Sequence, residues 1–137
     1  MPDPVVSKRD FETLADFRYQ LRRFLRFSEA AARRHGLTPL QYQLLLQIKG
    51  YPGRDWATVG ELAERLQAQH HGVVALVSRC EALGLLTRAP GRNDRRRVEL
   101  RLTAKGERVV AKLAELHRAE LVSLKGRFFV PDLDAFE

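Results

Sequence analysis

The stretch from Thr58 to Gly106 constrains the fold most, because it reads as helix, turn, helix and then a two-stranded hairpin. The first helix can be formed by TVGELAERL and the second by HHGVVALVSRCEAL, with a short turn at residues 67–69. Strands can be formed by LLTRA and RVELRLT, which would pair around the arginine-rich sequence PGRNDRR. This order of elements predicts a mainly α fold that carries one small β-hairpin.

Capping signals set the helix boundaries. A capping box begins at Thr58, and Gly84 can close the second helix of the pair. An earlier helix is predicted to open at Thr38-Pro39, with Gln41 in the reciprocal capping position. Its expected inward residues are Leu40, Leu44, Leu45 and Ile48. The loop that follows, at residues 51–57, holds the only tryptophan of the chain.

Long helices are predicted at both ends. An amphipathic helix should span residues 10–36, after a loose arm at residues 1–9 in which prolines oppose regular structure. Its apolar side is formed by Phe11, Leu14, Phe17, Leu21, Phe24, Leu25 and Ser28. A final helix should open at Thr103 and carry along one side Val109, Val110, Leu113, Leu116, Leu121 and Leu124.

The chain of 137 residues is long enough for one core, so we predict a single domain at residues 1–137. Within it, residues 38–103 would form the helix-turn-helix with its hairpin, and residues 10–36 and 104–137 would form dimerisation helices. The tail holds five apolar residues, namely Phe128, Phe129, Val130, Leu133 and Phe136. The simplest account is that both long helices and this tail pack against a second copy. The alternative is that the tail folds back on its own monomer.

The charge balance favours an anionic partner. The net charge is +7 and the pI about 10.2, which suits a polyanion or an anionic membrane surface, although some soluble proteins are merely basic. One cysteine allows no internal disulfide, and the chain holds neither a membrane-spanning run nor a secretory signal. We therefore expect a cytoplasmic protein with no membrane association. The preference for arginine, alanine and leucine suggests a bacterial source.

The second helix of the pair offers a surface for reading base edges in the major groove. Val73, Val77 and Cys80 fall on one stripe and should face inward. The outward set is then Gln69, His70, His71, Gly72, Val74, Ala75, Ser78 and Arg79. Gln and His side chains can hydrogen-bond base edges, and small apolar side chains can contact thymine methyl groups. We expect this weakly charged face to discriminate between sequences.

The hairpin offers a surface for holding phosphates. Its candidate contact residues are Arg88, Arg92, Asn93, Asp94, Arg95, Arg96 and Arg97. Arginine binds phosphate through a planar fork and enters narrow minor grooves. Asp94 would hold a neighbouring arginine rigidly by hydrogen bonding, although an exposed turn can also carry a solvated charge run without function. In the second strand, Val98, Leu100 and Leu102 should be buried while Arg97, Glu99 and Arg101 face water.

These motifs, in this order, resemble the MarR family (multiple antibiotic resistance regulator) of winged helix-turn-helix proteins. GLTPLQYQLLLQI is similar to the family's second helix, and VGELAERL to the helix before the turn. LVSRCEALGLLTR is similar to the end of its recognition helix, and NDRRRVELRLTAKGE to its wing. The wing hallmark falls on Asp94 and Arg96, followed by Leu102, Thr103 and Gly106. The resemblance covers nearly the whole chain.

The resemblance implies a homodimer that represses transcription from a pseudo-palindromic double-stranded DNA operator. Recognition helices would enter successive major grooves, and a wing arginine would enter the minor groove. Many members release DNA when a small aromatic or amphipathic anion binds between the dimerisation and DNA-binding parts. The chain departs from the family pattern at His70-His71-Gly72, where small hydroxyl residues are usual. Its loop from Gly50 to Ala57 is longer than usual, and its C-terminal tail is shorter.

Three sensing devices were weighed. Cys80 could respond to oxidation, but its core position argues for an inert thiol. A metal set of His35, His70, His71, His117 and Cys80 matches no zinc spacing, so no metal or cofactor is expected. A small-molecule pocket could be lined by Tyr19, Phe27, Tyr42 and His117, although aromatic residues at helical spacing usually belong to a core. The effector-binding residues stay unassigned, and a repressor without an effector is the alternative.

Two other classes of protein were considered. A winged-helix adaptor for protein or RNA would lack a specific operator, and a pure protein adaptor would prefer an apolar face to a basic wing. An enzyme is not expected, because the chain offers no nucleophile–base pair, paired carboxylates or glycine-rich phosphate loop.

Overall fold

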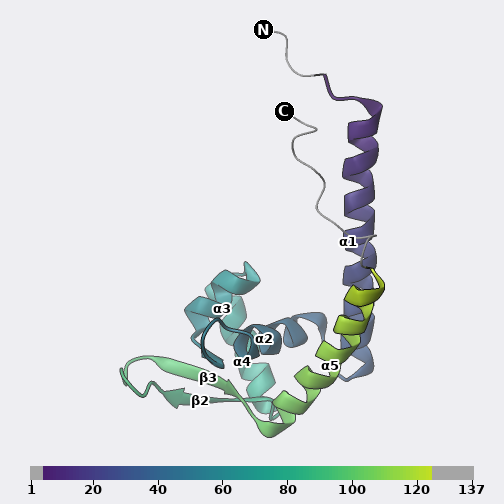
Figure 1. The fold of residues 1–137 in the computed structure, drawn as a ribbon. Helices are drawn as coiled ribbons and strands as arrows, with labels where there is room; N and C mark the ends of the chain where they lie inside the picture. Colours follow the sequence, from purple (N-terminus) through teal and green to yellow (C-terminus); the bar gives the residue numbers. More distant parts are fainter. Residues whose placement is uncertain (1–4, 125–137) are drawn as a thin grey trace.

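The computed structural model describes residues 5–124 (Figure 1). The elements are, in order, α1 (Lys8–Arg34), α2 (Pro39–Lys49), β1 (Trp56–Ala57), α3 (Val59–Leu66), α4 (His70–Ala82), β2 (Leu86–Pro90), β3 (Val98–Leu102) and α5 (Ala104–Ser123). The apolar tail, for which packing against a second copy is predicted, lies outside the described residues. Its apolar residues are Phe128, Phe129, Val130, Leu133 and Phe136.

Reciprocal capping boxes begin three of the helices. Thr38 and Thr58 each accept a hydrogen bond from the third residue of their helix and receive that residue's side chain on their own backbone N–H, as predicted. Ser7 and Asp10 form a third box, so α1 begins at Lys8. The expected loose arm up to residue 9 is therefore too long, because the Ser7 signal was overlooked.

The core surrounds α2. Leu44, Leu45 and Ile48 are completely buried, and the inward stripe of α4 is buried against them as predicted. Leu40 was expected to face the core, but it is 58% exposed. The next two residues, Gln41 and Tyr42, are buried, so Leu40 lies on the side of this first turn that faces away from the core.

The hairpin is part of a three-stranded antiparallel sheet of order β1-β3-β2. The predicted pair β2 and β3 is confirmed, with Leu86 opposite Leu102. Residues 51–57 are predicted to be a loop, but Trp56 and Ala57 pair with β3. A strand of two residues has no alternation to detect, so no periodic signal could have revealed it.

The predicted alternation along β3 is correct at Leu100 and wrong at its neighbours. Leu100 is completely buried, but Val98 is 46% exposed and Glu99 only 5% exposed. Arg101, expected to face water, is half-buried. Glu99 is buried because its carboxylate is fully engaged by hydrogen-bond donors from the same hairpin, and Val98 is exposed where the hairpin leaves the core.

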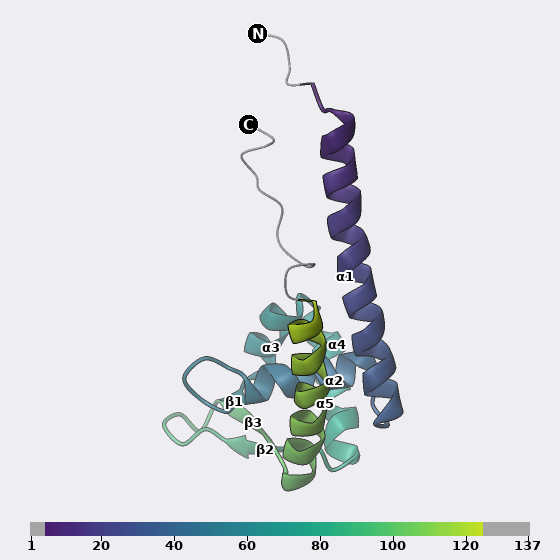
Figure 2. The same cartoon turned by 45° about the vertical axis from the view of Figure 1, so that its right-hand side comes forward.

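The N-terminal half of α1 stands clear of the other described elements (Figures 1 and 2). Large apolar side chains of α1 and α5 are exposed, namely Phe11, Leu14, Tyr19, Leu25, Leu121 and Val122. Within residues 5–124, no helix combines the length and the hydropathy that crossing a bilayer requires.

Cys80 lies in the core on the inner stripe of α4. Its exposed fraction is 0%, and burial raises the pKa of the thiol from 9.0 to about 11. Since the thiolate is the reactive form, a rise of this size lowers its population about 100-fold. The thiol therefore has the properties of an inert packing group.

We predict that iodoacetamide alkylates Cys80 at least about 100-fold more slowly in the native protein than in urea. The physical reason is the raised pKa of the thiol together with its complete burial. Mass spectrometry of timed samples measures both rates. Rapid native alkylation would show that α4 opens readily and would revive oxidation as a signal.

Glu61 stabilises the start of α3. Its Oε1 accepts from the backbone N–H of Thr58 at 2.9 Å, and its Oε2 accepts from Arg54. Burial alone would raise the pKa of the carboxyl, but hydrogen bonds from Thr58, Arg54 and Tyr51 lower it from 4.5 to about 2. The ionised form is therefore preferred in the folded protein.

Because the pKa of Glu61 is lower in the folded state than in the unfolded state, its stabilisation is present above pH 4.5 and is lost as the pH falls toward 2. We expect Glu61→Gln to reduce the free energy of unfolding by roughly 1–2 kcal/mol at neutral pH, discounted for partial exposure. Urea unfolding of both proteins should show this difference closing across that acidic range. A difference independent of pH would contradict the assignment.

Candidate nucleic-acid interface

The outer face of α4 is open along its whole length. All eight residues predicted to face outward are exposed, namely Gln69, His70, His71, Gly72, Val74, Ala75, Ser78 and Arg79. The three residues predicted to face inward are buried. The face therefore presents amide, imidazole, hydroxyl and small apolar groups, which are the groups that read base edges.

The N-terminus of α4 is free of its own capping side chain. Gln69 occupies the N-cap position but makes no side-chain capping hydrogen bond, and the first turn holds no acidic residue. The N-cap side chains of α1, α2, α3 and α5 each accept a backbone hydrogen bond. The first backbone N–H groups of α4 therefore have no side-chain cap. Because the N-terminus of a helix attracts anions, these groups are available to an anionic ligand.

The wing tip is a tight loop at residues 91–97. The backbone N–H of Gly91 donates to the carbonyl of Arg97 at 2.7 Å, and Arg97 N–H donates to the carbonyl of Asp94 at 3.1 Å. A Cβ at Gly91 would lie 2.4 Å from the Asp94 carbonyl oxygen, so only glycine fits there. The four arginines of this loop, Arg92, Arg95, Arg96 and Arg97, are exposed, and the Arg96 side chain is 95% exposed.

Asp94 contacts Arg96, in the geometry expected from the sequence. One carboxylate oxygen, Oδ1, accepts from the Arg96 backbone N–H at 3.0 Å and from its Nε at 3.5 Å. This leaves the two terminal nitrogens of the guanidinium directed to solvent. Asp94 therefore restrains the base of the Arg96 side chain while its fork stays available to an anion.

Arg88 was expected to bind phosphate with the tip, but it lies between the wing and α4. Its Nη2 donates to Ser78 Oγ at 2.7 Å, and its Nε lies 3.4 Å from Glu81 Oε1. The contact joins the two predicted halves of the interface. Ser78 is accordingly engaged with the wing as well as exposed on α4.

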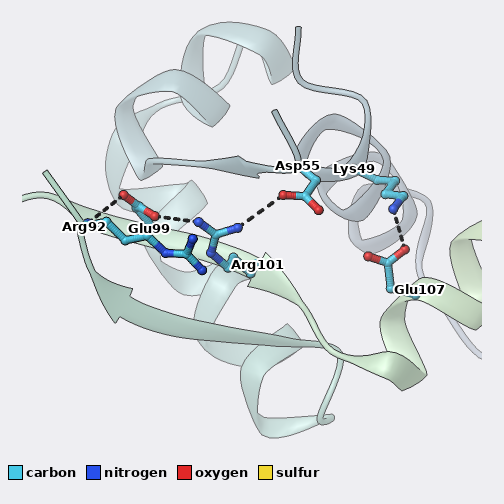
Figure 3. A network of polar contacts seen from close by, with 6 residues as sticks. All are labelled: Lys49, Asp55, Arg92, Glu99, Arg101 and Glu107. Carbon is cyan, nitrogen blue, oxygen red and sulfur yellow. Dashed lines mark hydrogen bonds and ion pairs between the residues drawn. The ribbon is translucent and has the colours of Figure 1, made fainter. Parts of the chain in front are cut away.

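A polar network that the sequence analysis did not identify runs beneath the wing (Figure 3). Glu99 accepts from the Arg92 backbone N–H at 3.2 Å and from Arg101 Nη2 at 2.9 Å. Arg101 Nη1 also donates to Asp55 at 3.2 Å. Nearby, Lys49 pairs with Glu107 at 2.8 Å, a contact that raises the pKa of the Lys49 ammonium. The sequence feature that could have indicated this network is Glu99, a single glutamate in a strand rich in arginine.

The structure places the histidines apart from one another or on the surface. His70 and His71 are exposed on α4, whereas His117 is buried and contacts Ser28 Oγ at 2.7 Å and the Leu113 carbonyl at 2.7 Å. Among the residues that the structure describes, no three His, Cys, Asp or Glu side chains group as metal ligands.

An open cavity of about 580 Å³ lies between α2 and α5. Its lining includes Tyr42, Leu46, His117, Arg118 and Leu121. Tyr42 stacks on His117 with ring centroids 5.0 Å apart, and burial raises the pKa of its phenol. Of the aromatic residues considered from the sequence, Tyr42 and His117 line the cavity.

Two further expectations for the cavity differ from the structure. Tyr19 is 58% exposed on the free half of α1, so it lies away from the cavity. Phe27 meets the His117 ring edge-on at 5.6 Å and supports the cavity wall through that contact.

Comparison with known proteins identifies the family. The family model described as MarR family matches residues 35–97, whereas no curated protein matches the chain. The transcriptional regulator Tm0710 from Thermotoga maritima is 31% identical, with coverage of 87% of this chain and 80% of its own and a TM-score of 0.65. A MarR family protein from Bacillus stearothermophilus is 23% identical, with coverage of 96% and 91% and a TM-score of 0.75.

A third similar structure contains nucleic acid. A MepR variant from S. aureus bound to an oligodeoxyribonucleotide is 20% identical to this chain. The alignment covers 82% of this chain and 81% of that one, with a TM-score of 0.66.

The element order, five helices with a small three-stranded antiparallel sheet, matches the winged-helix fold of MarR structures. Together with the family match and the 31% identity over most of the chain, this shows that the protein belongs to the MarR family of transcriptional regulators.

Proposed function

We propose that the protein is a sequence-specific, double-stranded-DNA-binding repressor that acts as a homodimer in the cytoplasm. The observation that carries this proposal is the continuous surface made by α4 and the wing, which the contact between Arg88 and Ser78 joins. The MepR structure that carries an oligodeoxyribonucleotide has the same fold, which supports placing DNA on this surface.

The two parts of this surface have different tasks in the proposal. The exposed face of α4 reads base edges through Gln69, His70, His71 and Ser78, because these groups are polar but mostly uncharged. The wing supplies affinity through its exposed arginines, which neutralise phosphates and release counterions. Arg96 is the arginine we assign to the minor groove, because Asp94 restrains only the base of its side chain.

The proposed dimer uses the long helices. The exposed apolar side chains of α1 and α5 need a cover, and a second copy of the chain supplies one with two-fold symmetry. Two recognition helices related in this way would read a pseudo-palindromic operator.

An effector fits the cavity between α2 and α5. Its lining is mostly apolar, with Arg118 and the His117 ring at its wall, which suits a small aromatic or amphipathic anion. Because the cavity lies between the C-terminal half of α5 and α2, which belongs to the DNA-binding part, a ligand there would change the distance between the two recognition helices of the dimer and release DNA.

We predict that Arg96→Ala weakens binding to any DNA sequence about 5- to 10-fold at moderate salt and makes the salt slope shallower by about 1. Fluorescence anisotropy with a specific and a mixed-sequence duplex, over a series of salt concentrations, measures both effects. Arg108→Ala, which removes an equal charge from an exposed position on α5, is the matched control. Unchanged affinity in Arg96→Ala would overturn the wing assignment.

We predict that His71→Ala changes which bases are preferred while leaving the salt slope unchanged, because this side chain is assigned to a base edge and not to a phosphate. Selection of bound DNA from a random pool, followed by sequencing, should show a loss of preference at one position of each half-site. The same selection names the operator. Failure to retain any site, including DNA flanking the protein's own gene, would instead favour a protein or RNA adaptor.

A further inference from the structure

We propose that Glu99, Arg101 and Asp55 are positioning residues that brace the wing in its DNA-binding shape. The inference rests on the proposed function, because it assigns a task to groups beneath the surface that would bind DNA. None of the three belongs to the surface itself. They act on it through hydrogen bonds to the wing tip and to the loop before β1 (Figure 3).

Glu99 is the centre of the brace. It is 5% exposed, and both of its carboxylate oxygens are engaged. Oε2 accepts from the Arg92 backbone N–H at 3.2 Å, so the carboxylate reaches from strand β3 to the start of the wing tip. Oε1 accepts from Arg101 Nη2 at 2.9 Å, which balances the buried charge.

Arg101 connects the wing to a different part of the chain. Its Nη1 donates to Asp55 Oδ1 at 3.2 Å, and the two residues are 46 positions apart in sequence. Arg101 lies opposite Trp56 in the β1–β3 register, so the backbone pairing and the side-chain bridge support the same junction. This arginine therefore has an intramolecular partner on each side and is not free for phosphate.

The loop at residues 50–57 is itself held firmly. The Arg54 guanidinium lies over the Tyr51 ring at 4.2 Å and over the Trp56 ring at 3.7 Å, and it pairs with Glu61 at the start of α3. Stacked and ion-paired arginine is well suited to fix a loop. This loop thus places Asp55 against β3 of the wing and is itself joined to α3 through Arg54 and Glu61.

The wing tip needs such a brace because of its charge. Four arginines lie within residues 92–97, where like charges repel one another before any phosphate neutralises them. The hydrogen bond that the Arg92 backbone N–H donates to buried Glu99 restrains the tip without neutralising an exposed guanidinium. Ordering the tip in advance lowers the entropy that DNA binding would otherwise cost.

The test compares Glu99→Gln with Glu107→Gln in the full chain. Both substitutions remove one negative charge and break an ion pair of the same region, but Glu107 pairs with Lys49 and does not contact the wing. Any general gain in DNA attraction from the added net positive charge is therefore shared. Amide hydrogen exchange of residues 91–97 is measured without DNA, and affinity for a mixed-sequence duplex is measured over a salt series.

For Glu99→Gln we expect exchange in the wing tip to accelerate about 10-fold or more and DNA affinity to fall about 5-fold relative to Glu107→Gln. The salt slope should stay as in the natural protein, because the number of arginines that reach phosphate is unchanged. Asp55→Asn changes an exposed side chain, so its effects should be smaller. We expect exchange in the wing tip to accelerate about 2-fold and DNA affinity to fall about 2-fold.

The possible results separate three claims: that the brace exists, that it positions the wing for DNA, and that the protein binds duplex DNA. Unchanged exchange in both Glu99→Gln and Asp55→Asn would overturn the brace, whatever the DNA result. Faster exchange with unchanged DNA affinity would show that the brace exists but does not position the wing for binding, which overturns the proposal. If the natural protein binds no duplex, the proposed function fails together with the positioning role, while the exchange data still decide whether Glu99 orders the tip.

Discussion

The burial of α2 is the constraint on which the rest of the structure depends. This helix contacts α1, α3, α4, α5, β1 and β3, and no other described element reaches as many. Leu44, Leu45 and Ile48 are completely buried, and each contributes roughly 1.5–3 kcal/mol by leaving water. The capping box at Thr38 and the stop at Gly50 fix the length of the helix. Helix α4 and the wing are thereby attached to one buried centre.

Much of the fold follows from local signals in the sequence. Capping pairs such as Thr58 with Glu61 and the inner stripe around Val77 are determined by a few neighbouring residues, so they were predicted correctly. The exposed set on α4 followed from that stripe. Leu40 and Glu99 were misplaced because periodicity does not determine the side of an element that is covered: Leu40 faces away from the core, and Glu99 is buried where it accepts hydrogen bonds from Arg92 and Arg101. Helical spacing and strand alternation carry no information about such contacts.

The wing arginines divide into groups that a count of positive charge cannot separate. Arg96 directs its guanidinium to solvent, whereas Arg101 is held between two carboxylates and Arg88 joins the wing to α4. A sequence run of like charges therefore combines contact groups with structural ones. The distinction depends on Asp55, which lies far from the wing in sequence and becomes its neighbour only through the β1–β3 pairing.

Trp56 has a consequence for how the wing can be observed. It is the only tryptophan of the chain, and its ring lies 3.7 Å from the Arg54 guanidinium, 6.0 Å from that of Arg97 and 5.9 Å from that of Arg101. Indole emission responds to nearby cations and to water. The protein thus has its single tryptophan at the junction of loop, sheet and wing, and selective excitation of this indole reports movement of the wing without an attached dye.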